Sequence, residues 1–377
     1  MTSYQFLKPF TFKNKGITLK NRIVIPPMTT RLSFEDGTVT RDEIAYYAQR
    51  AGGAGLFITG VSNVNPLGKG FEGELSVSDD SFIPRLSELA AAMKINGTKA
   101  VLQIFSAGRM SDSKILRGNQ TVSASSIAAP RPGAETPRAL SNEEILQTIK
   151  DFGEATRRAI EAGFDGIELH GANTYLIQQF FSPHSNRRDD KWGGTLEKRM
   201  KFPLAVVAAA EAAIEKYATR PFILGYRISP EELEEPGITL DDTLALIRAL
   251  KQTSIDYLHV SQGNAWRTPL RDKSSKVIVN EVIKKELNGE LPMIVVGGIT
   301  HPEEAEKAAQ SFDLVAIGKG VIYEPKWVQK VENNDEASIR YSFSRSELED
   351  LNIPQTLLEM IGYASGGSEN IKFSTGE

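Results

Sequence analysis

Short apolar runs alternate along the chain with longer segments in which apolar residues recur at helical spacing. Eight of the runs favour β-strands in composition, and Gly, Pro or polar residues bound them, as is typical of short strands. These runs are Arg22–Met28, Gly55–Val61, Lys99–Ile104, Gly166–His170, Phe222–Ile228, Tyr257–Ser261, Met293–Val296 and Leu314–Gly318. The pattern therefore predicts eight strands separated by helices.

The predicted helices are Arg41–Ala51, Ile83–Asn96, Asn142–Glu161, Leu196–Tyr217, Leu240–Thr253, Lys276–Leu287 and Pro302–Ser311. Four of them open with Ser or Thr and an acidic residue three positions later, the pattern of a capping box. These pairs are Thr40/Glu43, Ser141/Glu144, Thr239/Asp242 and Thr300/Glu303. Strands that alternate with helices form a parallel sheet, and eight such strands close into a (β/α)8 TIM barrel.

The connections between the predicted elements differ in length at the two ends of the strands. Links from helix to strand have about three to five residues, whereas several links from strand to helix are long, including the Pro/Ala/Ser-rich stretch Ala124–Arg138. Extended loops at the C-terminal ends of the strands are typical of a barrel's catalytic face. We expect a barrel over residues 1–340 and a C-terminal extension over residues 341–377, with one or two short helices and a disordered end, Ser365–Glu377.

The composition excludes several classes of partner. The chain has 44 Lys+Arg and 48 Asp+Glu, a formal charge of −4, and the charges are interspersed, so neither nucleic acid nor an anionic membrane surface is an expected partner. No apolar run approaches the roughly 20 residues that cross a bilayer. The segment Met1–Phe12 has no apolar signal core, so we expect a cytoplasmic protein.

Cysteine is absent, and there are only four His. Disulfides, thiolate zinc sites, cysteine nucleophiles and Cys-ligated iron–sulfur clusters are thereby excluded. No H-E-x-x-H pair occurs among His170, His184, His259 and His301. We therefore expect no protein-ligated metal.

Polar residues gather at the predicted strand ends, where a barrel carries its active site. The first strand runs through Pro27 and Met28 into Thr29, and other strand ends carry Gln103, His170 and Arg227, with Asn173 and Tyr175 just beyond His170. The last two strands end in Gly297-Gly298 and Gly318-Lys319. Glycine lets backbone N–H groups approach phosphate oxygens, and barrel phosphate sites recur after strands seven and eight. These two strand ends therefore predict a phosphate site.

Each of these residues also has a structural interpretation. His170 is equally compatible with a core histidine, and Gln103 and Arg227 with a polar layer inside the barrel. Tyr175 begins an apolar run, so packing alone would account for it. Glu168 lies two residues from His170 on the same strand face, but no second acid follows, which argues against a paired-carboxylate hydrolase.

Longer motifs resemble a known family. In chain order they are Leu19–Val24, Pro27–Thr29, Ala107–Arg109, Gly163–Ala172, Tyr175–Phe180 and Ser182–Gly194. Together they resemble the Old Yellow Enzyme family in its bacterial NADH:flavin oxidoreductase branch, and the resemblance extends in unbroken order over Phe6–Val328.

The resemblance implies a non-covalent FMN at the barrel mouth. It implies that Pro27, Met28, Thr29, Val61, Gln103 and Arg227 line the isoalloxazine ring and that Gly298, Gly318 and Lys319 hold the phosphate. It further implies that His170 and Asn173 hydrogen-bond a substrate carbonyl or phenolate oxygen and that Tyr175 is the proton donor. Such residues tune the flavin and stabilise the charge that develops on the substrate.

The activity implied is ping-pong hydride transfer from NADH or NADPH through flavin N5 to a small electrophile such as an enone or a quinone. Another FMN-barrel dehydrogenase, or an idle barrel that binds a phosphate ligand, remains an alternative. Relatives with a Cys-ligated cluster carry further domains, which we do not expect here; a homo-oligomer stays open. Three residues depart from the family pattern: Lys319 replaces the usual Arg, Arg31 replaces an aromatic residue, and Trp192 replaces Tyr.

Overall fold

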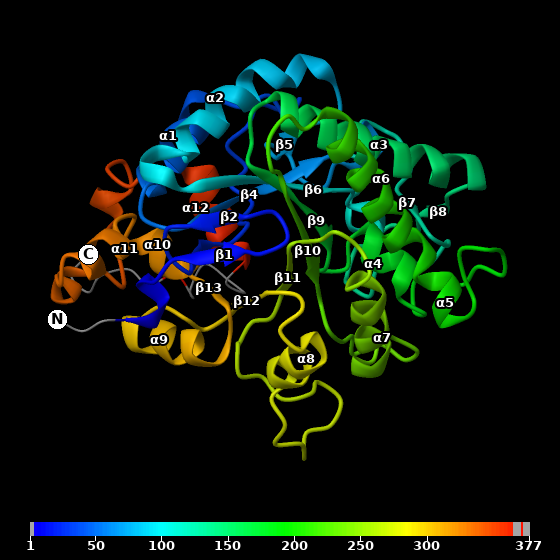
Figure 1. Cartoon of the computed structure of the whole chain (residues 1–377). Helices are drawn as coiled ribbons and strands as arrows, with labels where there is room; N and C mark the ends of the chain where they lie inside the picture. The colour runs from blue at the N-terminus through cyan, green and yellow to red at the C-terminus, as the bar shows by residue number, and fades with distance from the viewer. Residues whose placement is uncertain (1–3, 365–370, 372–377) are drawn as a thin grey trace.

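The eight apolar runs form parallel strands whose hydrogen bonds close into a ring in the computed structural model, which describes residues 4–364 and 371 (Figure 1). The barrel strands are β3 (Ile23–Ile25), β4 (Leu56–Asn63), β6 (Lys99–Phe105), β9 (Gly166–Gly171), β10 (Ile223–Ile228), β11 (Tyr257–Val260), β12 (Met293–Val296) and β13 (Leu314–Ala316). Each strand pairs with the next, and β3 pairs with both β4 and β13. The predicted (β/α)8 barrel is confirmed.

Helices surround this barrel and pack their apolar faces on the strands (Figure 1). They are α1 (Arg41–Arg50), α2 (Ile83–Met93), α3 (Asn142–Glu161), α5 (Leu196–Arg199), α6 (Lys201–Tyr217), α7 (Leu240–Leu250), α8 (Val279–Leu287), α9 (Pro302–Ser311), α10 (Lys319–Tyr323) and α11 (Trp327–Glu332). A further short helix, α4 (Leu176–Phe181), begins just after Tyr175. No helix among the described residues is long and apolar enough to span a membrane.

Several predicted boundaries were wrong. The first strand ends at Ile25 because Pro26 and Pro27 have no N–H with which to continue the ladder. The predicted helix Leu196–Tyr217 is two helices, since Pro203 has no N–H to offer the carbonyl of Arg199, where α5 ends. Other ends moved by a few residues: Ile83–Asn96 ends at Met93, Leu240–Thr253 ends at Leu250, and Lys276–Leu287 begins at Val279.

Two of the four predicted capping boxes form as predicted, at Ser141/Glu144 and Thr239/Asp242. The box predicted at Thr300/Glu303 was wrong, because α9 begins one residue later. Glu304 accepts hydrogen bonds from the N–H groups of Thr300 (2.8 Å) and His301 (3.0 Å). Thr40 caps α1 through the N–H of Glu43, but the Glu43 carboxylate turns elsewhere.

A hairpin that the sequence pattern did not predict closes the N-terminal end of the barrel. Strands β1 (Phe10–Phe12) and β2 (Ile17–Leu19) pair antiparallel, and Phe12 and Leu19 join the apolar cluster inside the barrel. Short pairs in the loops, β4 with β5 (Leu75–Ser76) and β7 (Val122–Ser123) with β8 (Arg138–Ala139), were also not predicted.

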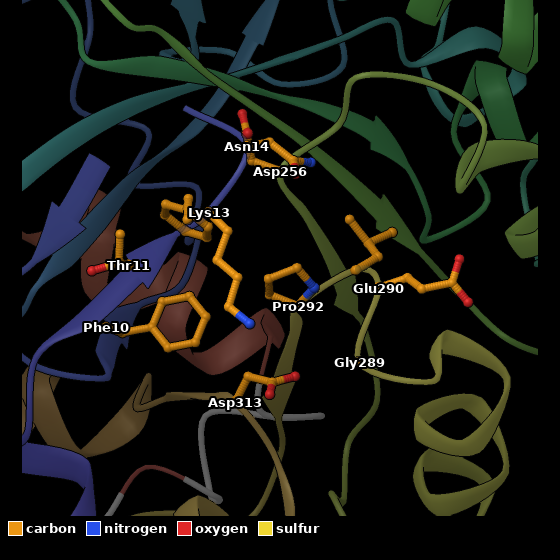
Figure 2. A pocket seen from close by; sticks show the side chains of 11 residues that line it. Phe10, Thr11, Lys13, Asn14, Asp256, Gly289, Glu290, Pro292 and Asp313 are labelled. Carbon is orange, nitrogen blue, oxygen red and sulfur yellow. The ribbon is translucent and has the colours of Figure 1, made fainter. Parts of the chain in front are cut away.

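A pocket of about 190 Å³ lies beside this hairpin. Figure 2 shows Lys13 lying between Phe10 and Pro292 with its amine toward Asp313. Asp256, Pro292 and Asp313 each directly precede a barrel strand, so the pocket lies at the N-terminal ends of the strands. Residues at that end of a barrel serve stability, whereas catalysis belongs to the opposite end.

The C-terminal extension contains helix α12 (Gln355–Ala364), which agrees with the short helices expected there. Its residues Leu357 and Ile361 join the main hydrophobic cluster of the barrel. The domain boundary near residue 340 stays a prediction. The predicted disorder of Ser365–Glu377 lies outside the described residues, except for Ile371, which is buried.

Glu43 is a fully buried acid on α1. Its carboxylate accepts hydrogen bonds from the hydroxyl of Thr30 (2.6 Å) and from that of Ser33, so it anchors the loop that follows β3. Burial raises the pKa of Glu43 to about 7, and the hydrogen bonds from Ser33 and Thr30 offset only part of that effect.

The stability of the fold should therefore depend on Glu43 in a defined pH range. Because its pKa is raised in the folded state, its stabilising contribution is complete below about pH 4.5 and is lost as pH rises through about 7. As pH rises through this range, the unfolding free energy of wild type should fall by up to about 3 kcal/mol relative to that of Glu43→Gln, because Gln does not ionise. Urea unfolding at several pH values measures the difference, with exposed Asp42→Asn as the control. A difference that does not change with pH would contradict the assignment.

Candidate active site

A chain of buried polar side chains crosses the interior of the barrel. Gln103 Nε2 donates to Glu168 Oε1 (2.7 Å), and Glu168 Oε2 lies 2.9 Å from His259 Nδ1. Burial raises the pKa of Glu168, but the opposing effects of His259, Arg227 and Gln103 are larger together, so its pKa lies below the ordinary value. Burial lowers the pKa of His259, which favours a neutral ring that donates to the carboxylate.

Several buried polar atoms of the described residues are left without hydrogen-bond partners. Within the described part of the protein, no hydrogen bond reaches Gln103 Oε1, Arg227 Nε or either polar side-chain atom of Gln262, although all are buried. A buried polar group without a partner costs about 1–3 kcal/mol. The atoms include donors and acceptors, so they suit a ligand that offers both along one edge.

A cavity of about 400 Å³ opens at the C-terminal ends of the strands. Seven of the nine residues predicted to bind a cofactor line it: Pro27, Met28, Thr29, Arg227, Gly298, Gly318 and Lys319. The other two lie outside its lining. Gln103 is part of the buried chain beneath, and Val61 packs in a cluster with Phe105 and Ala107.

The predicted phosphate residues lie together at this cavity. Gly297 and Gly298 have φ values of 119° and 68°, a region that favours glycine, and a Cβ on Gly297 would lie 2.5 Å from the carbonyl oxygen of Gln262. Among the described residues, no hydrogen bond uses the N–H of Gly298. Lys319 is exposed and adds a positive charge at the cavity. Backbone N–H groups and a cation are what a phosphate requires.

His170 lies at the end of β9 and is buried. Burial, followed by the charges of Arg227 and His259, holds the pKa of His170 well below its ordinary value, so the ring is neutral near pH 7. Its Nδ1 accepts a hydrogen bond from the N–H of Ala172 (3.3 Å). A neutral imidazole carries one proton, which this bond assigns to Nε2. His170 is therefore a neutral hydrogen-bond donor.

Asn173 follows in a left-handed conformation, with φ of 54°. Its backbone N–H donates to the hydroxyl of Ser229 (2.9 Å), and its Oδ1 accepts from the hydroxyl of Ser261 (2.9 Å). Since the Ser261 hydroxyl engages the amide oxygen, the side-chain NH2 is left to donate. Two neutral donors, one from His170 and one from Asn173, thus come from one strand end.

Tyr175 packs against His170, with ring centroids 4.9 Å apart and an interplanar angle of 80°. It also makes an edge-on contact with Phe105, at 5.0 Å and 87°. The structure thus brings Tyr175 beside the predicted donors, and its ring also makes packing contacts, as the structural interpretation expected.

Some residues at the site were missed by sequence reasoning. Gln262 is the second residue after the end of β11, a position at which a polar residue is itself a signal. Tyr46 and Ile322 also line the cavity, as do three residues of α12, and no motif marks them. Arg31 has a φ of 58°, and its Nε donates to the carbonyl of Glu72 (3.2 Å).

The long Ser182–Gly194 motif has a structural role. Asn186 Nδ2 donates to the carbonyls of Phe180 (2.6 Å) and Trp192 (2.8 Å), and Arg188 pairs with Asp190 at 2.6 Å. The indole N–H of Trp192 donates to Asn142 (3.0 Å). These contacts fix the loop and leave its residues without a place at the cavity.

Comparison with known proteins identifies the family. The model of the NADH:flavin oxidoreductase / NADH oxidase family matches residues 5–337. The chain belongs to this family. It is 40% identical over 360 residues to a probable NADH-dependent flavin oxidoreductase of Bacillus subtilis, with 95% of this chain and 96% of that protein covered.

It is also 47% identical over 358 residues to the NADH:acrylate oxidoreductase of Vibrio harveyi, covering 92% of this chain but only 35% of that protein. The chain thus spans about a third of this longer relative, and it likewise spans 39% of the NADH:fumarate oxidoreductase of Klebsiella pneumoniae. An Old Yellow Enzyme homologue from Zymomonas mobilis shares the fold with a TM-score of 0.75 and 25% identity, over 87% of this chain and 92% of that one.

These findings confirm the resemblance recognised in the motifs. Membership of the NADH:flavin oxidoreductase / NADH oxidase family implies FMN as the cofactor and a nicotinamide as the electron donor. The residues present fit FMN. Gln103, Arg227 and Gln262 hold orphaned polar atoms suited to the edge of a heterocycle, and Gly298 and Lys319 suit a phosphate.

Lys319 should act on the phosphate alone. We expect Lys319→Ala to weaken FMN binding about tenfold, because one charge-assisted contact is lost, and to leave the affinity for riboflavin, which has no phosphate, unchanged. Fluorescence titration of apoprotein with both flavins measures this. Lys326→Ala, outside the residues that line the cavity, is the matched control. An equal loss for both flavins would place Lys319 away from the phosphate.

Proposed function

We propose that the chain is an ene-reductase that reduces the activated double bond of an α,β-unsaturated carbonyl or a similar small electrophile. The observation that carries the proposal is the grouping of a neutral donor on His170, a second donor on Asn173 and the ring of Tyr175 at the ends of the barrel strands. FMN, when bound, supplies the hydride.

The roles of the residues follow from the charge that develops on the substrate. The donors of His170 and Asn173 hold the carbonyl oxygen and stabilise its negative charge as the hydride arrives. Their neutrality matters, because a protonated His170 beside Arg227 would be opposed by burial and by like charge. Tyr175 delivers the proton to carbon. Pro27, Met28, Thr29, Val61, Gln103 and Arg227 surround the flavin ring in this proposal.

The comparisons support a conjugated electrophile. The two longer relatives are named for acrylate and fumarate, which are α,β-unsaturated carboxylates. Nicotinamide and electrophile would use the same space in turn, which gives ping-pong kinetics. Family membership supports neither the dehydrogenase alternative, which needs a Cys or Ser base, nor an idle phosphate-binding barrel. A cytoplasmic location stays a prediction from the sequence, and the oligomeric state stays open.

Tyr175→Phe tests the proton donor, because it keeps the ring that packs on Phe105 and His170 and removes only the hydroxyl. A positioned general acid contributes about 10²–10⁴-fold to its step. We expect oxidation of the reduced variant by 2-cyclohexenone to slow by about 10²-fold or more, while reduction by NADH or NADPH stays near wild type. Stopped-flow absorbance resolves the two half-reactions, with a quinone oxidant as the control that needs no proton at carbon. Equal slowing of both half-reactions would count against the role.

Phenol binding tests whether His170 and Asn173 are the hydrogen-bond donors. Both donate to an anionic oxygen, so para-substituted phenols should bind as phenolates and give a long-wavelength charge-transfer band. We expect the double variant His170→Ala/Asn173→Ala to retain FMN and lose this band in absorbance titrations. Persistence of the band would show that the donors are other residues. The single variant Ser261→Ala, which frees the Asn173 amide oxygen, should weaken phenol binding by a smaller factor.

A further inference from the structure

The FMN cavity has a wall that does not come from the barrel. Leu357, Met360 and Ile361 of α12 line it together with Gly298 and Lys319. Their spacing puts them on one face of the helix. The family model matches residues 5–337, so α12 lies beyond the part of the chain that defines the family. The cavity therefore joins the phosphate residues of the family to a helix of the C-terminal extension.

The extension is tied firmly to α1. Arg50 is buried, its Nη2 donates to the carbonyls of Leu351 (3.0 Å) and Ile322 (3.4 Å), and its guanidinium lies 3.8 Å from the ring centroid of Tyr46. A side-chain hydrogen bond also joins the extension to α1, in which Asn352 Nδ2 donates to Gln49 Oε1 (3.0 Å). The wall thus has a fixed position against the barrel.

Two residues that contact Arg50 connect this attachment of the C-terminal extension to the cavity. Tyr46 and Ile322, which Arg50 holds together, both line the cavity beside α12. Tyr46, Ile322, Leu357, Met360 and Ile361 contribute apolar surface to the cavity lining, whereas Gly298 and Lys319 contribute polar groups. Leu357 and Ile361 are buried in the hydrophobic core, but Met360 is only half-buried, which leaves part of its side chain facing the cavity.

We propose that α12 is part of the cofactor site and that Met360, with Tyr46 and Ile322, covers the apolar dimethylbenzene edge of FMN. The inference rests on FMN as the ligand, as in the proposed function. The side chains of Ile322, Leu357, Met360 and Ile361 are apolar, and the dimethylbenzene edge is the part of the flavin ring system without polar atoms. Burying that edge removes apolar area from water and so slows release of the cofactor.

Flavin binding tests the proposal without recourse to activity. We expect Met360→Ala in the full chain to weaken FMN binding about tenfold and to weaken riboflavin binding by the same factor, because the contact is with the ring and not with the phosphate. Fluorescence titration of apoprotein and the rate of flavin release measure both. Glu359→Ala, on the exposed face of α12, should leave both affinities unchanged.

Met360→Leu provides a second variant of similar volume, which should restore most of the affinity that Met360→Ala loses. Far-ultraviolet circular dichroism and thermal unfolding of the apoproteins show whether the variants fold as the wild type does. Unchanged affinities in folded Met360→Ala would overturn the inference, as would a loss confined to FMN. If wild type takes up no FMN, the proposed function fails as well. If wild type binds FMN and reduces enones while Met360→Ala binds both flavins normally, only this inference fails.

Discussion

Closure of the sheet between its first and last strands is the contact on which the site depends. β13 pairs with β3 through Val315–Ile23 and Ala316–Val24, although the rest of the barrel lies between them in the chain. The strands are parallel, so closure brings all their C-terminal ends to one rim. Residues as distant in sequence as Met28 and Lys319 then line one cavity. An open sheet would separate them by its full width.

A buried carboxylate inside the barrel holds side chains of several strands in place below that rim. Glu168 is fully buried, and its partners His259 and Gln103 come from two other strands. An ionised carboxylate is tolerated there only because those donors and the charge of Arg227 compensate for lost hydration. The same network holds Gln103 with its buried amide oxygen unpaired among the described residues, and Arg227, whose charge compensates Glu168, lines the cavity. The structural interpretation of these residues is therefore confirmed, and it is compatible with the cofactor-binding role, which stays a prediction.

The C-terminal extension gives the site a feature that the barrel alone does not have. The longer relatives from Vibrio and Klebsiella match this chain over only a third or so of their length, so a barrel of this kind also occurs within larger proteins. In this chain, the extension packs on α1 and α10 and reaches the cavity through α12.

The sequence by itself determined the barrel and placed most of the candidate site residues at its C-terminal rim, because alternating strand and helix patterns are local and strand ends in a parallel barrel share one rim. Glycines after the last strands, and His170, Asn173 and Tyr175 after β9, were identifiable by position and motif. Gln262 was missed although it lies two residues beyond the end of a strand. Tertiary structure alone decided the rest. Only the packing shows that the Glu43 carboxylate accepts a hydrogen bond from Thr30 instead of completing a capping box. The same holds for Phe12, which packs inside the barrel, and for α12, which lines the cavity. Each depends on a contact between segments far apart in the chain, and a local pattern of apolar and polar residues carries no information about such partners.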